Sequence, residues 1–251
     1  MTLDADVIRI VPVHRVDELA APAHAPAPPP ELTYRNGPLL EAVEVFTVFW
    51  GAWWQSGDGA TLAQQLNDFF DAILASALMD QLAEYGVTGR PIGHGTRTGT
   101  TTIAEPALGA TVSDATARRT LDGLIAAGTV PPAGPNALTF LYLPPNVAVT
   151  MGGSRSCQAF CGYHDAIGGT TFYAVMPYPG CAGCAGGLSP LDALTSTSSH
   201  ELCEAVTDPV PGTGWYDDVH GEIGDICAWQ TKQVAGYTVQ LEWSNAQGAC
   251  V

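Results

Sequence analysis

Hydrophobic and polar residues follow two patterns along this chain, one typical of strands and one typical of helices. Runs rich in β-branched and aromatic residues predict strands at residues 44–50, 137–143, 171–176 and 237–243, and a threonine-rich run predicts another at 96–103. Gly51 ends the first of these runs. Because the strands are interleaved with helical segments, the pattern predicts an α/β fold in which helices pack on a sheet.

Three segments carry the signals of helices. A stripe at helical spacing predicts a long helix over residues 61–85, with Leu62, Leu66, Phe69, Phe70, Ile73, Leu74 and Leu78 on its buried face. A serine N-cap and a closing glycine bound a second helix at residues 114–127. A Ser-Pro start and a proline stop bound a third at about residues 190–206.

The first 32 residues lack such a pattern. Residues 20–30 are almost entirely alanine and proline, which predicts a flexible tail over residues 1–32, with a removable pro-segment as the alternative. The charges Asp4, Asp6 and Arg9 interrupt the first apolar run, unlike the unbroken core of a secretory signal. Residues 33–251 are numerous enough to bury one large core and are predicted to form a single domain.

The charge balance excludes two classes of partner. Nine basic residues stand against 25 acidic ones, for a net charge of −16, and Lys232 is the only lysine. Such a surface repels nucleic acids and anionic membranes and attracts cations. No run of about 18 apolar residues is present, so we expect no membrane span and no nucleic-acid partner.

The third predicted helix carries the sequence His200-Glu201-Leu202-Cys203-Glu204. Positions four apart share one face of a helix, so His200 and Glu204 can bind the same ion. Glu201 lies about 100° around the helix, where the H-E-x-x-H zinc enzymes place their general base. The alternative without a metal is a solvated helix face that carries two acidic residues.

Such a site needs a third protein ligand and an open position for water. The polar stretch 217–225 offers candidates, of which we expect Asp225 first and Glu222 second; the others are Asp217, Asp218 and His220. His200 favours Zn²⁺, whereas the many oxygen donors leave Ca²⁺ as a structural ion.

Seven cysteines lie in the C-terminal half, in a region predicted to be rich in loops. Six flank predicted loops, which suggests disulfides and an oxidising compartment; they are Cys157, Cys161, Cys181, Cys184, Cys227 and Cys250. The alternative is a structural zinc held by the pairs at 157/161 and 181/184. Cys203, inside the motif helix, is predicted to be a small buried apolar residue.

From about residue 33 onward, an ordered set of motifs resembles the exordium, or phosphate-induced, family. The set comprises Thr33-Tyr34-x-x-Gly37-Pro38-Leu39-Leu40, Phe49-Trp50-Gly51, Cys157-x3-Cys161-Gly162-Tyr163-His164, Cys181-x2-Cys184, His200-Glu201-x2-Glu204-x2-Thr207-Asp208-Pro209, Trp215-Tyr216 and Glu222-Ile223-x-Asp225-x-Cys227. The family is best known from plant cell-wall proteins, which usually have asparagine where Asp208 stands. The resemblance implies secretion and disulfides, and from it we expect the pairs 157–161, 181–184 and 227–250.

The same resemblance draws attention to His164, which would lie in a cross-linked loop facing the cleft. His164 and Tyr216 are then candidates to stabilise an oxyanion, or His164 to bind the metal. The alternatives are a histidine bonded to a backbone carbonyl and a packed tyrosine ring.

Together these features predict a secreted zinc metallopeptidase with a zincin-like fold, that is, a mixed twisted sheet packed by helices. In this hypothesis His200, Glu204 and Asp225 hold Zn²⁺, and Glu201 activates the metal-bound water that attacks a peptide bond of a peptide or protein substrate. One alternative is a non-catalytic secreted signalling or binding protein with a structural metal site. Another is a glycan-binding module that uses Trp53, Trp54 and Trp215.

Overall fold

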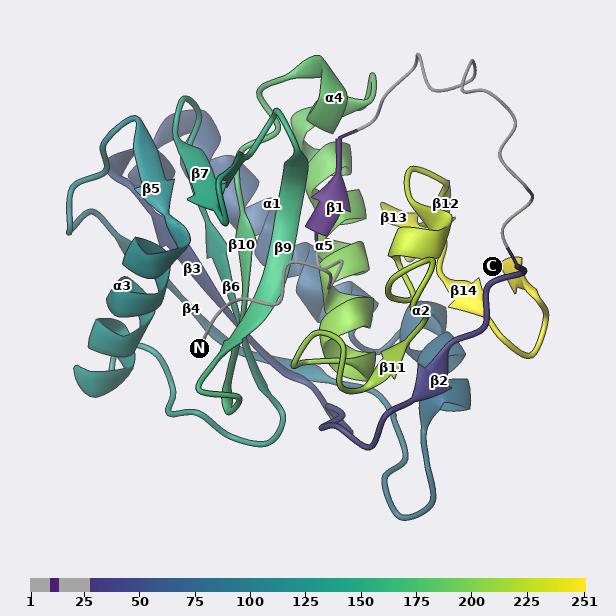
Figure 1. Ribbon diagram of the computed structural model, residues 1–251. Coiled ribbons are helices and arrows are strands. Elements are labelled where there is room, and N and C mark those ends of the chain that lie inside the picture. The colour runs from purple at the N-terminus through teal and green to yellow at the C-terminus, as the bar shows by residue number, and fades with distance from the viewer. Residues whose placement is uncertain (1–9, 14–27) are drawn as a thin grey trace.

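The computed structural model describes residues 10–13 and 28–251 (Figure 1). Its main sheet contains β1 (Ile10–Pro12), β3 (Glu44–Trp50), β4 (Thr96–Ile103), β6 (Ala137–Tyr142), β9 (Phe160–Ile167) and β10 (Thr171–Met176). Smaller sheets pair β2 (Thr33–Tyr34) with β11 (Trp215–Tyr216), β12 (Thr231–Val234) with β13 (Tyr237–Gln240), β14 (Trp243–Ser244) with β15 (Ala249–Cys250), and β7 (Ala148–Met151) with both β5 (Thr111–Ser113) and β8 (Ser154–Arg155). The helices are α1 (Gly57–Ile73), α2 (Ala77–Leu82), α3 (Asp114–Ala126), α4 (Ala182–Ala185) and α5 (Pro190–Thr207), with the 3-10 turns η2 (Ala52–Gln55), η3 (Ala83–Tyr85) and η4 (Asp225–Cys227).

The main sheet is mixed, with the strand order β1-β9-β10-β6-β3-β4. Strands β10, β6, β3 and β4 run parallel to one another, β9 runs antiparallel to β10, and β1 runs antiparallel to β9. The predicted strands at 44–50, 96–103, 137–143 and 171–176 are therefore confirmed as β3, β4, β6 and β10, and so is the α/β class. The strand predicted over 237–243 is split, because β13 ends at Gln240 and β14 begins at Trp243.

Alternate side chains of the main strands enter two separate cores. Phe49 and Phe140 pack with α1 and α5, whereas Trp50 and Leu141 pack with α3 and with the small sheet of β5, β7 and β8. Successive side chains of a strand point to opposite faces, so one run of residues serves both cores. The result is a layered molecule in which α5 lies against the sheet, as predicted.

The long helix predicted over residues 61–85 is interrupted at Ser76. This serine is extended (φ −117°, ψ 177°), and its hydroxyl donates to the carbonyl of Ile73 and accepts the N–H of Leu78. It therefore ends α1 and caps α2, which periodicity alone does not reveal. None of the helices in the described residues combines the length and apolar character needed to cross a bilayer.

Residues 160–167 form β9, in place of the loop expected around His164. Seven of its eight residues are buried, and so the strand shows none of the alternation by which half-buried strands are recognised. Its outer neighbour is β1, in which Ile10 pairs with Tyr163 and Val11 with Gly162. Strand β1 lies within residues 1–32, which were expected to form a flexible tail. The rest of the prediction for residues 1–27 lies outside the described residues.

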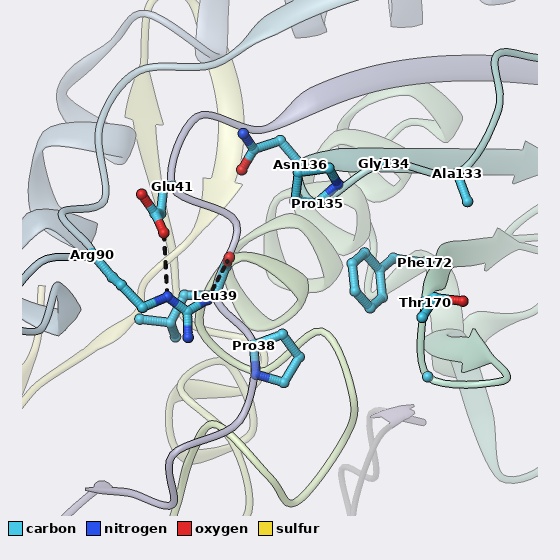
Figure 2. Close-up of a pocket in the computed structure, with 11 residues that line it drawn as sticks. Pro38, Leu39, Glu41, Arg90, Ala133, Gly134, Pro135, Asn136, Thr170 and Phe172 are labelled. Carbon is cyan, nitrogen blue, oxygen red and sulfur yellow. Dashed lines mark hydrogen bonds and ion pairs between the residues drawn. The ribbon is translucent and has the colours of Figure 1, made fainter.

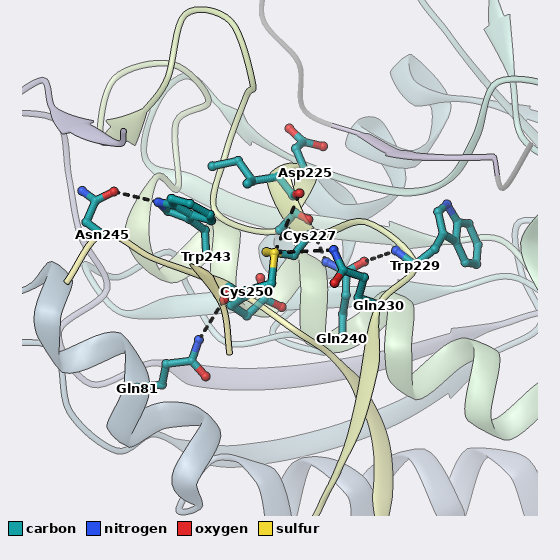
Figure 3. Close-up of a disulfide and its surroundings, with 12 residues drawn as sticks. Gln81, Asp225, Cys227, Trp229, Gln230, Gln240, Trp243, Asn245 and Cys250 are labelled. Carbon is teal, nitrogen blue, oxygen red and sulfur yellow. Dashed lines mark hydrogen bonds between the residues drawn. A yellow bond between two sulfur atoms is a disulfide. The ribbon is translucent and has the colours of Figure 1, made fainter. Parts of the chain in front are cut away.

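Three disulfides cross-link the C-terminal half: Cys157–Cys181, Cys161–Cys184 and Cys227–Cys250 (Figure 3 shows the third). The third pair was predicted, whereas the pairs 157–161 and 181–184 are wrong. The four cysteines considered for a structural zinc are joined in disulfides instead. Cys161 lies on β9 beside α4, which carries Cys184. Each of the first two disulfides therefore links the segment of Cys157 and Cys161 to the segment of Cys181 and Cys184. Three disulfides are typical of an oxidising, extracellular-type environment.

Candidate metal centre

Helix α5 supplies three acidic or imidazole side chains from inside the molecule. It begins at Pro190, after Ser189, whose hydroxyl accepts the N–H of Asp192, and it ends before Asp208. All of its residues from 193 to 207 are buried, between β13 on one side and the main sheet on the other. His200, Glu201 and Glu204 therefore project into the core and not into solvent, which argues against the bland alternative of a solvated helix face.

The predicted ligands come together in a first group. His200 Nε2 lies 2.9 Å from Glu204 Oε1 and 3.9 Å from Asp225 Oδ1. Each of the three residues can offer one ligand atom within 4.8 Å of the other two. Asp225 belongs to η4, and its backbone N–H donates to Glu204 Oε1 at 3.1 Å, which fixes this turn against α5.

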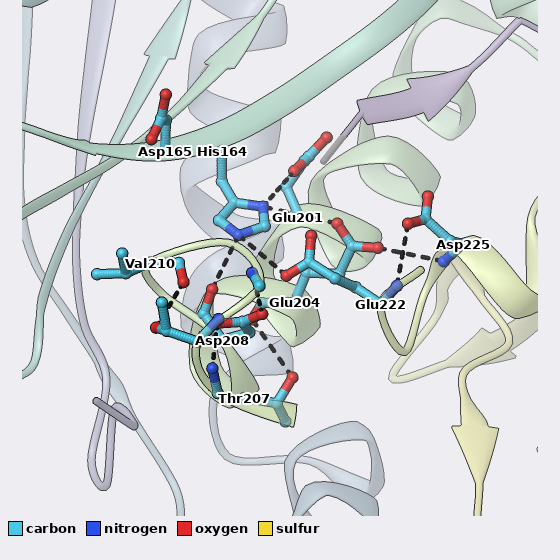
Figure 4. A network of polar contacts seen from close by, with 12 residues as sticks. His164, Asp165, Glu201, Glu204, Thr207, Asp208, Val210, Glu222 and Asp225 are labelled. Atoms are coloured by element: carbon cyan, nitrogen blue, oxygen red, sulfur yellow. Dashed lines mark hydrogen bonds and ion pairs between the residues drawn. The ribbon is translucent and has the colours of Figure 1, made fainter. Parts of the chain in front are cut away.

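A second group shares Glu204 with the first and adds His164 from β9 (Figure 4). His164 Nδ1 lies 3.0 Å from Glu201 Oε2 and 3.6 Å from Glu204 Oε2. On the other side of the ring, Nε2 lies 3.2 Å from the backbone oxygen of Asp208. The histidine expected on a loop is thus held on the sheet, with its ring between α5 and the loop that follows.

Glu222 lies beside the two groups and is also buried. Together, the six residues of the buried cluster are His164, His200, Glu201, Glu204, Glu222 and Asp225. Glu222 Oε1 lies 3.6 Å from His164 Nε2, and its backbone N–H donates to Asp225 Oδ2 at 3.0 Å. We expected it as the second choice for the third ligand, and the structure brings it to the cluster beside Asp225, the first choice.

The buried cluster contains many polar atoms that lack hydrogen-bond partners. Within the described residues these atoms are His200 Nδ1 and Nε2, Glu201 Oε1, Glu204 Oε2, both carboxylate oxygens of Glu222, and Asp225 Oδ1. Buried polar groups are normally satisfied, because an unpaired one costs a few kcal/mol. A set of imidazole and carboxylate atoms that is unsatisfied and convergent fits a bound cation, and the donor set suits a divalent metal.

The electrostatics of the cluster reflect this crowding. Burial, together with the charge of Glu204, raises the pKa values of Glu222 and Asp225 well above their ordinary range. Burial alone would lower the pKa of His164, but its hydrogen bond to Glu201 and the neighbouring negative charges raise it to about 9. The metal-free cluster therefore retains protons at pH values at which solvent-exposed carboxylates and imidazoles would lose them.

Two glycines allow this packing. A Cβ at Gly224 would lie 2.7 Å from His200 Nδ1, and one at Gly162 would lie 3.2 Å from Glu201 Oε1. The contact at Gly224 is closer than a Cβ allows, and the contact at Gly162 is tight, so both positions favour glycine.

Asp208 and Glu242 are two buried acids for which no role was predicted. Asp208 caps the turn after α5, because its carboxylate accepts the backbone N–H groups of Gly212, Thr213 and Gly214, and its carbonyl faces His164. Glu242 is fully buried, and burial raises the pKa of its carboxyl group, which lies beside the Cys203 thiol. The sequence Asp208-Pro209 was a recognisable signal for the turn after α5. Glu242 stands alone before Trp243 and belongs to no motif.

The remaining candidates lie elsewhere. Asp217 pairs with His220 at 3.0 Å, and Asp218 pairs with Arg35 at 2.6 Å, both nearer the surface. Tyr216 is buried on β11, with the guanidinium of Arg35 4.6 Å from its ring centroid, and its oxyanion role remains a prediction.

A cavity of about 540 Å³ opens at another place, near the start of β6 and β10 (Figure 2). Leu39, Pro135 and Phe172 line it, and Arg90 at its edge is bonded to Glu41 at 3.2 Å. No residue of the buried cluster lines this cavity, so it adds nothing to the chemistry of the metal centre.

The comparison with known proteins leaves the family open. No protein-family model matches this chain, and no curated protein matches it.

Proposed function

We propose that this protein is a zinc-dependent peptidase with a zincin-like arrangement of sheet and helix. One observation carries the proposal: His200, Glu204 and Asp225 converge in a buried group in which each residue has at least one polar atom without a hydrogen-bond partner among the described residues. A motif that is merely solvated would not gather a third carboxylate from a separate segment 21 residues downstream of Glu204.

The residues take distinct roles in this proposal. His200, Glu204 and Asp225 would hold the cation, which when bound polarises a peptide carbonyl and lowers the pKa of water. Glu201 holds Oε2 against His164 and leaves Oε1 without a partner, so Oε1 is the atom that takes the proton of the attacking water. His164 orients the Glu201 carboxylate and thereby acts as its positioning residue.

Zinc is the preferred ion because of the donor types. The two groups together present two imidazoles and three carboxylates, and imidazole favours zinc and its neighbours over calcium. Calcium would draw on the oxygen donors alone and would leave the nitrogen atoms of His200 without a partner.

A specific observation also favours the alternative, a secreted signalling or binding protein with a structural metal. Every member of the cluster has at most a few per cent of its side chain exposed, and His200, Glu201, Glu204 and Glu222 are fully buried. Structural metal sites are closed, whereas a catalytic site must admit substrate. The proposed peptidase therefore requires that the segments around the cluster open.

The test is metal analysis of the purified protein combined with hydrolysis of casein. We expect bound zinc, and we expect Glu201→Gln to keep the zinc at His200, Glu204 and Asp225 while lowering kcat by about 10²- to 10⁴-fold, the range for loss of a general base. Glu44→Gln, an exposed carboxylate on β3, is the matched control and should keep full activity. Tightly bound metal without hydrolysis by the wild type would support the structural alternative instead.

A further inference from the structure

The contacts of His164 Nδ1 with two carboxylates call for either a proton or a metal ion beside this atom. Nε2 faces the backbone oxygen of Asp208 at 3.2 Å, and a carbonyl only accepts, so Nε2 carries the hydrogen of the neutral ring. Nδ1 then presents a lone pair to Glu201 Oε2 at 3.0 Å and to Glu204 Oε2 at 3.6 Å. Three acceptors cannot face one another without a proton or a metal ion between them.

The partner of the other ring nitrogen of His164 favours a metal ion over a proton at Nδ1. Histidines that bind metals usually donate their other N–H to a carbonyl or carboxylate, which fixes the ring and its tautomer. His164 has this partner in Asp208, which is itself fixed by the N–H groups of Gly212 and Gly214 at 2.6 Å.

The two oxygens of Glu204 point to different histidines. Oε1 lies 2.9 Å from His200 Nε2, and Oε2 lies 3.6 Å from His164 Nδ1 and has no hydrogen-bond partner in the described part of the chain. One carboxylate with an imidazole on each side is the arrangement of a bridging ligand. In two-metal hydrolytic sites the ions lie about 3.5–4 Å apart, a spacing that one carboxylate spans.

The charge count also calls for more than one ion. Four carboxylates, those of Glu201, Glu204, Glu222 and Asp225, are buried together, and no lysine or arginine of the described residues forms an ion pair with them. The proposed ligands include three of these carboxylates, those of Glu201, Glu204 and Asp225. With all three ionised, one divalent cation would leave a negative charge uncompensated in the core, which is costly.

We propose that the cluster binds two divalent cations bridged by Glu204, the second held by His164 Nδ1, Glu201 Oε2 and Glu204 Oε2. The first cation is the one bound by His200, Glu204 and Asp225 in the proposed function. This inference rests on the proposed function for those ligands and not for the peptidase activity. Glu201 Oε1 stays clear of the second cation and remains the proton acceptor.

Manganese stoichiometry tests the pair without reference to catalysis. The metal-free full chain is loaded with Mn²⁺, freed of excess ion and measured by elemental analysis and electron paramagnetic resonance. We expect two Mn²⁺ per chain and the signal of an exchange-coupled pair. His164→Gln should retain one Mn²⁺ with an uncoupled signal, whereas His94→Gln, which removes an exposed histidine bonded to Asp80 at 2.8 Å, should retain two.

The outcomes separate this inference from the peptidase proposal. One uncoupled Mn²⁺ in the wild type overturns the pair and leaves a proton on His164 as the cation, whatever the activity. A coupled pair without hydrolysis of casein supports the two-ion site and overturns the peptidase. Should His164→Gln fail to fold, the wild-type spectrum alone still decides between one ion and two.

Discussion

At the scale of single residues, Gly224 determines how closely the backbone approaches the imidazole of His200. A methyl group at this position would lie 2.7 Å from Nδ1, and the fully buried ring has no room to move away. The ring can yield only by turning, which would move Nε2 away from Glu204 and Asp225.

We therefore predict that Gly224→Ala lowers zinc affinity by about 10- to 100-fold, the range for residues that support a ligand from behind. Competition with a chromophoric chelator measures the change. Gly123→Ala is the control, because no atom lies within 4 Å of a Cβ there and the helix α3 should gain slightly in stability. Equal affinities in both variants would mean that His200 is not a ligand.

Residue types and spacing predicted the members of the first group but not their surroundings. The i, i+4 relation of His200 and Glu204 follows from helix geometry, and Asp225 was the preferred third ligand. No local pattern relates Asp208 to His164, because that contact joins residues 44 positions apart through a backbone carbonyl. Contacts of this kind depend on the tertiary fold and leave no periodic trace in the sequence.

At the scale of elements, prediction succeeded where a segment shows one clear period or a cap. Helix α5 was expected over 190–206 and spans Pro190–Thr207, because serine and proline define its start. Strand β9 was missed because burial on both faces removes alternation, and its sequence includes Gly162, His164 and Asp165. The error placed His164, already a candidate metal ligand, on a loop instead of the sheet.

The disulfide Cys227–Cys250 connects the candidate metal centre to the C-terminal strands. Cys227 ends η4, whose first residue is Asp225, and Cys250 lies on β15 (Figure 3). The bond closes a sequence separation of 23 residues, and loops of that length are worth about 3 kcal/mol in the chain-entropy account. It therefore serves both the stability of the fold and the position of Asp225.

Replacing both Cys227 and Cys250 by serine should lower the free energy of unfolding by about 3 kcal/mol and also weaken zinc binding. Urea unfolding and zinc titration measure the two effects. The matched control replaces Cys157 and Cys181 by serine, because neither cysteine belongs to η4 and their loss should cost stability without changing zinc affinity. Unchanged zinc affinity in both double variants would show that the C-terminal disulfide does not position Asp225.

At the scale of the whole molecule, a chain of net charge −16 places several acids inside its own core. Burial and neighbouring negative charge raise the pKa values of Glu222 and Asp225, and the partners of His164 raise its pKa to about 9. All three shifts have the same sign. The folded metal-free chain therefore binds more protons than the unfolded chain between the ordinary carboxyl pKa values and about pH 9.

Stability follows from this excess of protons. Where the folded state binds more protons, the free energy of unfolding falls as pH rises. The cluster contributes most below the ordinary pKa of a glutamate, and that contribution is lost as pH rises through the raised pKa values of these groups, about 9 in the case of His164. Metal binding has the opposite dependence, because the ligands must lose protons before they can coordinate.

We therefore predict that the difference in Tm between zinc-loaded and chelator-treated protein widens steadily from about pH 5 to pH 8. Differential scanning calorimetry at matched ionic strength measures it, and subtracting the two curves removes the contribution of surface acids, which is common to both. Glu222→Gln should flatten the metal-free curve, because it removes a carboxyl whose pKa burial raises. A difference that stays constant over this range would mean that zinc binds outside the buried cluster, since a surface carboxylate site has already lost its protons at pH 5.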